Sequence, residues 1–155
     1  MYRSTILTVA ALLAACAAPM DRQRVSEHPA AVLEARLEAD YATVHRRILD
    51  GLRYCFMEQP TRRQLVVHDH RDKSRRTGEV VLADVFGKKG ESLHWLARTR
   101  AEDGATRLTV LVARKGWQEE AALVPRWAAG ELECGRFAPA LPAEEKAKDD
   151  FLSLR

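Results

Sequence analysis

The sequence has no long hydrophobic run, no large excess of one charge and few aromatic residues. Its N-terminal apolar stretch, residues 6–13, is far shorter than the roughly 20 residues that a membrane-spanning helix needs. The net charge is only +3, which excludes the strongly basic surface of a nucleic-acid-binding protein. The sequence also lacks Gly-x-Ser-x-Gly, His-Glu-x-x-His and a phosphate-binding glycine loop. We therefore expect neither an enzyme nor a nucleic-acid partner.

The N-terminus has the layout of an export signal. Arg3 precedes the apolar run, and small residues follow it. The segment ends in Leu13-Ala14-Ala15-Cys16, which resembles the lipobox of bacterial lipoproteins. The resemblance implies cleavage between Ala15 and Cys16, a diacylglycerol on the Cys16 sulfur and a third acyl chain, such as palmitate, on the new amino terminus. Three chains would anchor the protein almost irreversibly. A plain signal peptide with an Ala-x-Ala exit is the alternative.

The residues after Cys16 indicate location and domain organisation. Position 17 is alanine and not aspartate, which, by resemblance to sorted lipoproteins of Gram-negative bacteria, implies the outer membrane with the domain facing the periplasm. We expect a signal peptide over 1–15, a lipidated N-terminus and polar tether over 16–30, an α+β domain over 31–137 and a flexible, charged tail over 138–155.

Acylation of Cys16 would leave Cys55 and Cys134 as an even pair. Disulfides form and persist in the oxidising compartments to which exported proteins go. The sequence therefore predicts a Cys55–Cys134 disulfide, with two buried free thiols as the alternative.

Periodicity predicts the first two elements. Apolar and charged residues alternate over 32–39, which favours a strand, although the same residues are also good helix formers. Asp40 occupies an N-cap position. It is followed by an apolar stripe at spacings of three and four, made by Tyr41, Val44, Ile48, Leu52 and Cys55. We expect a helix that carries Cys55 near its end.

After Pro60 the period changes to two. We expect strands over 64–70, 79–86, 92–100 and 106–114, the last two joined by an Asp103-Gly104 turn. A helix follows over 117–130, with a break at Pro125 because proline is costly inside a helix. The order strand, helix, four strands, helix predicts an α+β two-layer sandwich with an antiparallel sheet of about five strands and two helices on one face.

The alternation also divides the sheet into two faces. We expect the core face to carry Leu65, Val67, Val80, Leu82, Leu93, Trp95, Ala97, Leu108, Val110 and Val112. The opposite face then carries Val66, Val81, Leu96 and Leu111, more apolar surface than a solvated face normally has. This predicts docking of an envelope protein partner or a second copy. The alternatives are that the tether or the tail covers this face, or that the register differs by one residue.

Two polar clusters are candidate sites. His68 and His70 share a strand face, and His94 is expected on the outward side of a neighbouring strand, so the three are a weak candidate metal site. Solvated histidines are the favoured alternative. A basic group is formed by Arg62, Arg63, Arg71, Lys73, Arg75 and Arg76. It is a candidate surface for anionic lipid or a cell-wall polymer, against the simpler interpretation of a solvated hairpin.

The helix, the four-strand meander and the spaced residues Trp127, Gly130 and Cys134 together resemble a group of small proteobacterial lipoproteins. That resemblance covers roughly residues 35–135 and brings no activity, catalytic residues or cofactor. The function predicted from the sequence is a lipid-anchored periplasmic binding or assembly module. The alternative is a metal-binding protein or enzyme that uses the histidines of the sheet.

Overall fold

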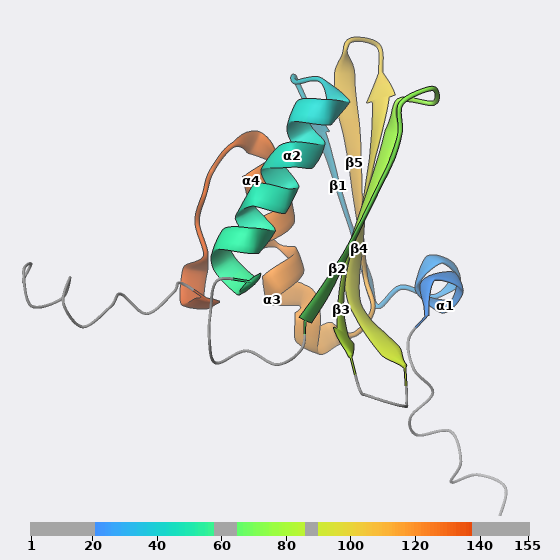
Figure 1. The fold of residues 1–155 in the computed structure, drawn as a ribbon, viewed down its shortest axis with the longest axis vertical. Coiled ribbons are helices and arrows are strands. Elements are labelled where there is room, and N and C mark those ends of the chain that lie inside the picture. The colour runs from blue at the N-terminus through green and yellow to red at the C-terminus, as the bar shows by residue number, and fades with distance from the viewer. Residues whose placement is uncertain (1–20, 58–64, 86–89, 138–155) are drawn as a thin grey trace, which may run out of the picture.

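The computed structural model describes residues 21–57, 65–85 and 90–137. It is an α+β sandwich in which helices cover one face of a five-stranded antiparallel sheet (Figure 1). This confirms the predicted fold class. We call the covered face the helix face and the opposite one the outer face.

The sheet has the strand order β1-β5-β4-β3-β2. Its strands are β1 (Ala31–Leu37), β2 (Leu65–Asp72), β3 (Thr77–Val85), β4 (Glu91–Glu102) and β5 (Ala105–Val112). The turn between β4 and β5 is Asp103-Gly104, and both residues have positive φ (46° and 81°). Positive φ at both central positions is what a type I′ hairpin turn requires, and it sets Glu102 opposite Ala105.

The long helix of the helix layer begins where Asp40 caps it. Asp40 Oδ1 accepts hydrogen bonds from the amides of Ala42 and Thr43, each at 3.0 Å, and Oδ2 accepts one from the Thr43 hydroxyl at 2.6 Å. Helix α2 then runs over Tyr41–Leu52 and continues as a π-helical turn over Arg53–Met57, which carries Cys55. The predicted N-cap and the predicted position of Cys55 are both confirmed.

The cap gives a pH-dependent contribution to stability. The Thr43 hydroxyl, and after it the Thr43 amide, hold the pKa of Asp40 below its usual value. Stabilisation from a lowered pKa is present above about pH 4, where the unfolded aspartate is ionised, and is lost as the pH falls through the folded-state value. We expect Asp40→Ala to lower the thermal midpoint at pH 7 and to differ much less from wild type at pH 2. Asp40→Asn should keep the cap, and its contribution to the thermal midpoint should not depend on pH. If the thermal midpoints of Asp40→Ala and wild type differ as much at pH 2 as at pH 7, this account is wrong.

The second helix of this layer is broken, as predicted, but the break lies three residues before the predicted position, Pro125. A single residue separates helix α3 (Gln118–Ala121) from helix α4 (Leu123–Ala129). The break lies at Ala122, so that Pro125 falls in the first turn of α4, where its missing amide costs no helical hydrogen bond. Gly130 ends α4 in the left-handed conformation at φ 103°.

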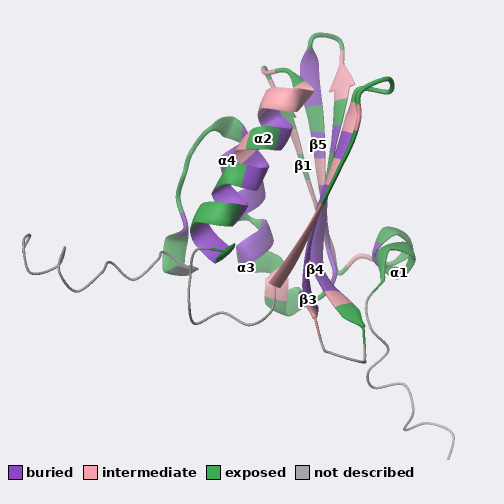
Figure 2. Cartoon of the chain, viewed as in Figure 1, coloured by how far each residue is buried: buried purple, intermediate pink, exposed green. Residues whose placement is uncertain are grey.

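The core lies between the helices and the helix face. Its largest fully buried side chains include Trp95 of β4, Trp127 of α4 and Phe56 of the π-helical turn. Figure 2 shows the burial concentrated where α2, α3 and α4 face the middle of the sheet. Nine of the ten side chains predicted for the core face pack here, namely Leu65, Val67, Val80, Leu82, Trp95, Ala97, Leu108, Val110 and Val112.

Leu93 is the exception, and a β-bulge is the reason. The β3–β4 register pairs Leu82 with Trp95 but Ala83 with Leu93, so His94 is an extra residue in β4. A bulge of one residue exchanges the faces of the residues before it. Leu93 therefore packs in the cluster on the outer face, and the predicted outward position of His94 is wrong.

The disulfide closes the end of the helix layer. Cys55 and Cys134 are bonded, with a Cα–Cα distance of 5.3 Å and a sequence separation of 79. Cys55 lies in the π-helical turn that follows α2, and Cys134 lies four residues beyond Gly130. The predicted disulfide is present, and the alternative of free thiols is wrong.

A short helix on the outer face was not predicted from the sequence. Helix α1 (Arg22–Glu27) is capped by Asp21, whose carboxylate accepts a hydrogen bond from the Arg24 amide at 2.8 Å. It contacts β4 and β5 on the side away from the other helices (Figure 1). Residues 22–27, expected to be part of a polar tether, are therefore folded onto the sheet.

Candidate functional site

Helix α1 covers the apolar half of the outer face. Val25 is its one buried residue and packs in a cluster with Val81, Ala83, Leu93, Leu96, Leu111 and Ala113. Two polar contacts fix the helix beside this cluster. Arg22 Nη1 lies 3.0 Å from Glu79 Oε1, and Arg98 Nη2 donates to the Ser26 hydroxyl at 2.8 Å.

The position of α1 changes the interpretation of the expected partner face. Val81 and Leu96 are fully buried and Leu111 is nearly so, while Val66 of β2 is half-buried. Three of the four side chains predicted to meet a partner are thus covered by the chain itself. Of the alternatives considered for this face, coverage by the segment after Cys16 is the one that the structure contains.

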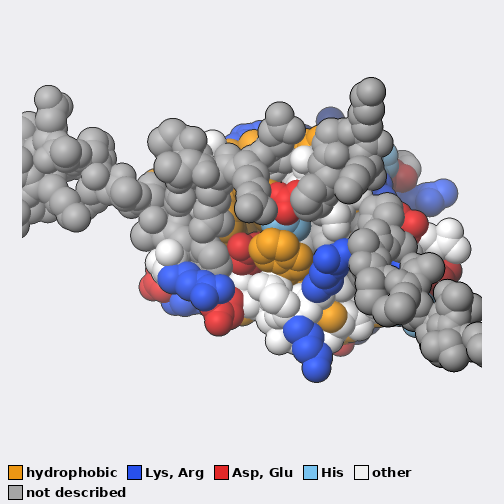
Figure 3. Space-filling view, turned by 90° about the horizontal axis from the view of Figure 1, so that it is seen from below, with side chains coloured by type: hydrophobic (Ala, Val, Ile, Leu, Met, Phe, Trp, Pro, Cys, Tyr) orange, Lys and Arg blue, Asp and Glu red, His pale blue; other side chains and the backbone are white. Residues whose placement is uncertain are grey.

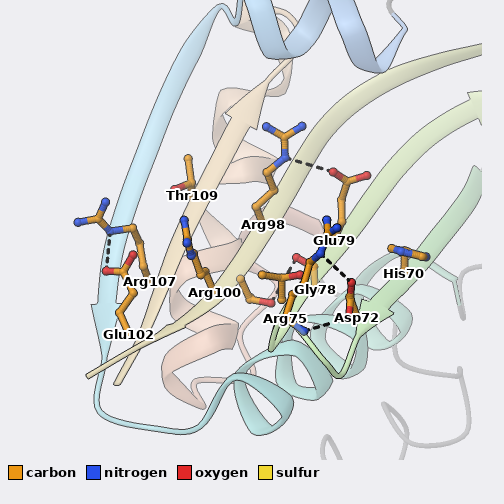
Figure 4. Close-up of a pocket in the computed structure, with 12 residues that line it drawn as sticks. His70, Asp72, Arg75, Gly78, Glu79, Arg98, Arg100, Glu102, Arg107 and Thr109 are labelled. Atoms are coloured by element: carbon orange, nitrogen blue, oxygen red, sulfur yellow. Dashed lines mark hydrogen bonds and ion pairs between the residues drawn. The ribbon is translucent and has the colours of Figure 1, made fainter. Parts of the chain in front are cut away.

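The other half of the outer face is a polar groove. Its volume is about 500 Å³, and α1 lies along its border (Figure 4). Four arginines line it, Arg75, Arg98, Arg100 and Arg107, together with three carboxylates, Asp72, Glu79 and Glu102. The threonines Thr77 and Thr109 add hydroxyl groups, and His70 stands at the β2 side. We call this cavity the outer groove.

The strand register lines up three arginines across the sheet. Arg36 of β1 is directly opposite Arg107 of β5, and Arg107 is directly opposite Arg100 of β4. We call Arg36, Arg107 and Arg100 the arginine row. Directly opposed residues of antiparallel strands point to the same face, and like charges in such pairs destabilise a sheet.

The members of the arginine row are not equally compensated. Arg107 Nε lies 3.2 Å from Glu102 Oε2, and Arg36 Nε lies 3.8 Å from Glu38 Oε1, with both arginine side chains more than half exposed. Arg100 is exposed, and its side chain has no ion pair or hydrogen bond within the described residues. The centre of the outer groove therefore carries an uncompensated guanidinium.

The carboxylates of the outer groove are already occupied. Glu79 pairs with both Arg22 and Arg98, the latter at 3.1 Å. Asp72 accepts hydrogen bonds from the Ser74 hydroxyl at 2.6 Å and from the amides of Ser74 and Arg75 at 3.0 Å each. The Ser74 hydroxyl, and after it the Arg75 amide, keep the pKa of Asp72 below its usual value, so this side chain is ionised and held in the β2–β3 turn.

The predicted basic hairpin contributes little to this groove. Arg71, Lys73, Arg75 and Arg76 are exposed around the β2–β3 turn, and Arg75 alone among them lines the groove. Arg62 and Arg63 lie outside the described residues. The arginine row, which sequence reasoning missed, comes from three other strands.

The three candidate histidines do not meet. His68 and His70 share the outer face as expected, and His68 Nε2 lies 2.6 Å from Glu91 Oε2. His94 belongs to the helix face because of the bulge. Within residues 21–57, 65–85 and 90–137, no group of three His, Cys, Asp or Glu side chains is arranged to hold a metal ion.

His94 instead lies in a buried acidic pocket at the end of the sheet. Its Nε2 lies 2.8 Å from Asp84 Oδ2, away from the direction of a well-aligned hydrogen bond, and its Nδ1 lies 3.4 Å from Glu120 Oε2. The imidazole stacks on the Trp117 ring at 3.6 Å and 8°. Figure 3 views this end, where acidic, histidine and hydrophobic side chains adjoin one another. Asp84, His94 and Glu120 are all buried, so the cluster lies at the edge of the core.

A second buried histidine lies in α2, outside the apolar stripe that the sequence predicts for this helix. His45 is fully buried, and its Nε2–H donates to Asp69 Oδ1 at 2.6 Å. A Cβ at position 78 would overlap the imidazole, so Gly78 of β3 is the residue that leaves room for it. The glycine opposite the helix was the one sequence signal for this contact.

Cys16 and Ala15, the predicted lipidation and cleavage residues, lie outside the described residues. No helix among the described residues is long and apolar enough to cross a membrane. Comparison of the sequence with protein-family models and with curated proteins gave no match.

Proposed function

We propose that the chain is a lipid-anchored lipoprotein of the bacterial envelope whose α+β domain is a binding and assembly module. The observation that carries this proposal is the use of the cysteines. The sequence has three, and the disulfide takes Cys55 and Cys134. Cys16, at the end of the lipobox-like Leu13-Ala14-Ala15-Cys16, is then the one thiol left for acylation.

The position of α1 supports the same proposal. Its N-cap, Asp21, follows Cys16 by five residues, and five residues extend at most about 18 Å. An acylated Cys16 would therefore hold the domain close to the lipid surface, with α1 and the adjoining outer face nearest to it. In this proposal the domain faces the periplasm from the outer membrane, because Ala17 and not aspartate follows the anchor. The outer groove is the surface offered for binding.

The anchor is tested by the mass of the N-terminal peptide of protein made in a Gram-negative host. We expect a peptide that begins at Cys16 and carries three acyl chains, and we expect palmitate labelling to disappear in Cys16→Ser. Membrane association should fall with it, since each buried methylene of an acyl chain contributes about 0.8 kcal/mol.

Ala17→Asp is the matched control for location. It keeps the acylated cysteine, so its labelling should equal that of wild type, while sorting should retain it in the inner-membrane fraction. A wild-type N-terminus without acyl chains would refute the proposed anchor.

A further inference from the structure

We propose that the outer groove binds a phosphate-bearing anion, with Arg100 as its central ligand and Arg107 beside it. The starting point is the arginine row. Neighbouring strands lie about 4.8 Å apart, so the three guanidinium-bearing positions span about 10 Å of one sheet face. Without an anion, this row places like charges opposite one another at two successive strand pairs.

The surrounding charges leave one place for that anion. Glu79 is held by Arg22 and Arg98, and Glu102 by Arg107. Asp72 is satisfied by the β2–β3 turn. Arg100, between Arg107 on one side and Thr77 on the other, keeps its donors available within the described part of the chain. An anion at Arg100 would meet a guanidinium that no carboxylate of the groove neutralises.

The donor set fits phosphate better than a single carboxylate. A guanidinium presents two parallel N–H donors, which one carboxylate satisfies completely. A phosphate has further oxygens for a second guanidinium and for hydroxyl donors. The groove supplies both kinds, with Arg107 next to Arg100 and the Thr77 and Thr109 hydroxyls on the flanking strands.

A phosphate group would reach the groove from one of two sources, a phospholipid headgroup or a soluble phosphate. The headgroup is within reach because the groove borders α1, through the contacts of Arg22 with Glu79 and of Arg98 with Ser26. That choice of source rests on the proposed anchor at Cys16, whereas the groove and its phosphate chemistry do not.

The test follows the arginine Nε–H signals of the full-length protein in neutral detergent by NMR. In the first titration inorganic phosphate is added, and sodium chloride at equal ionic strength is the control. In the second, dihexanoylphosphatidylglycerol is added below its micelle concentration, and dihexanoylglycerol, which lacks the phosphate, is the control. We expect saturable shifts of the Arg100 and Arg107 signals with the phosphate-bearing probes only. Stronger binding in the lipid arm identifies a headgroup site, and stronger binding in the inorganic arm identifies a soluble ligand.

Arg100→Gln should weaken binding about tenfold or more, because it removes charged donors from the centre of the site. It should leave the thermal midpoint unchanged or higher, since it also removes a like-charge pair. Arg46→Gln is the matched control, an exposed arginine of α2 without an ion pair in the described residues. Equal weakening by Arg46→Gln, or shifts that phosphate and chloride produce alike, would overturn the proposal. A protein without acyl chains that still binds phosphate would refute only the anchor.

Discussion

Replacing Cys55 and Cys134 together with alanine is expected to lower the free energy of unfolding by about 4 kcal/mol. The disulfide joins residues that are 79 positions apart, so its loss lets the unfolded chain explore many more conformations. Equilibrium unfolding in urea, comparing wild type with the double variant, measures the difference. Alanine is the appropriate replacement because both sulfurs are buried, and serine would add the separate cost of burying a hydroxyl group.

Reduction of the wild-type protein provides the control for this prediction. Reduced wild type and Cys55→Ala/Cys134→Ala should unfold at nearly the same urea concentration, since both lack the covalent link but keep similar packing. The slope of the transition should be steeper in both than in the oxidised protein, because an uncrosslinked chain exposes more surface on unfolding. Coincidence of the oxidised and reduced transitions would contradict the prediction.

The disulfide could be predicted from the sequence because counting the cysteines was enough and no geometry was needed. The same holds for the Asp40 cap and the Asp103-Gly104 turn, where a residue type answers a local backbone requirement. These local signals, added to the alternating apolar pattern, were enough to predict the antiparallel sheet and the order of the elements from β1 onward.

The bulge in β4 could not be predicted from the sequence in this way. Nothing in the residues around His94 marks the insertion of one residue into the ladder, and the contact of His94 with Glu120 of α3 is visible only in the folded chain. A single bulge moved Leu93 to the outer face and His94 to the helix face, and it separated the candidate metal ligands.

Helix α1 was missed because it is too short to show a period. Six residues make fewer than two turns, and Val25 is the one buried side chain among them. Isolated helices of this length are unstable, so its formation depends on the apolar cluster beneath it. The excess of apolar residues on the outer face was therefore a correct signal for a covering element, although the covering element is part of the same chain.

The arginines of the arginine row are present in the sequence, but they can be recognised as neighbours only when the register of the paired strands is known. A two-residue turn at Asp103-Gly104 pairs Glu102 with Ala105, and counting outward pairs Arg100 with Arg107. The third member, Arg36, required the knowledge that β1 lies beside β5 and not beside another strand. The candidate site thus became visible only when the chain topology was known.

Replacing Trp127 with alanine is expected to lower the free energy of unfolding by about 4 kcal/mol, as removal of a large buried aromatic side chain does. The Trp127 ring is 1 % exposed and meets Phe56 edge to face with centroids 6.0 Å apart. A Cβ at Gly51 would overlap it, which shows how closely α2 and α4 approach at this residue. Its Nε1–H also donates to the Glu133 carbonyl at 2.8 Å, next to Cys134 in the chain.

Trp127→Phe separates packing from the hydrogen bond in this prediction. Phenylalanine keeps most of the apolar contact but leaves the Glu133 carbonyl without its donor, so we expect a loss of about 1–2 kcal/mol in urea unfolding. Because Trp127 and the disulfide stabilise the same corner, the alanine variant combined with Cys55→Ala/Cys134→Ala should be less destabilised than the two effects added together. Strict additivity would mean that the ring packs independently of the bond, contrary to the contact of Trp127 with the segment that carries Cys134.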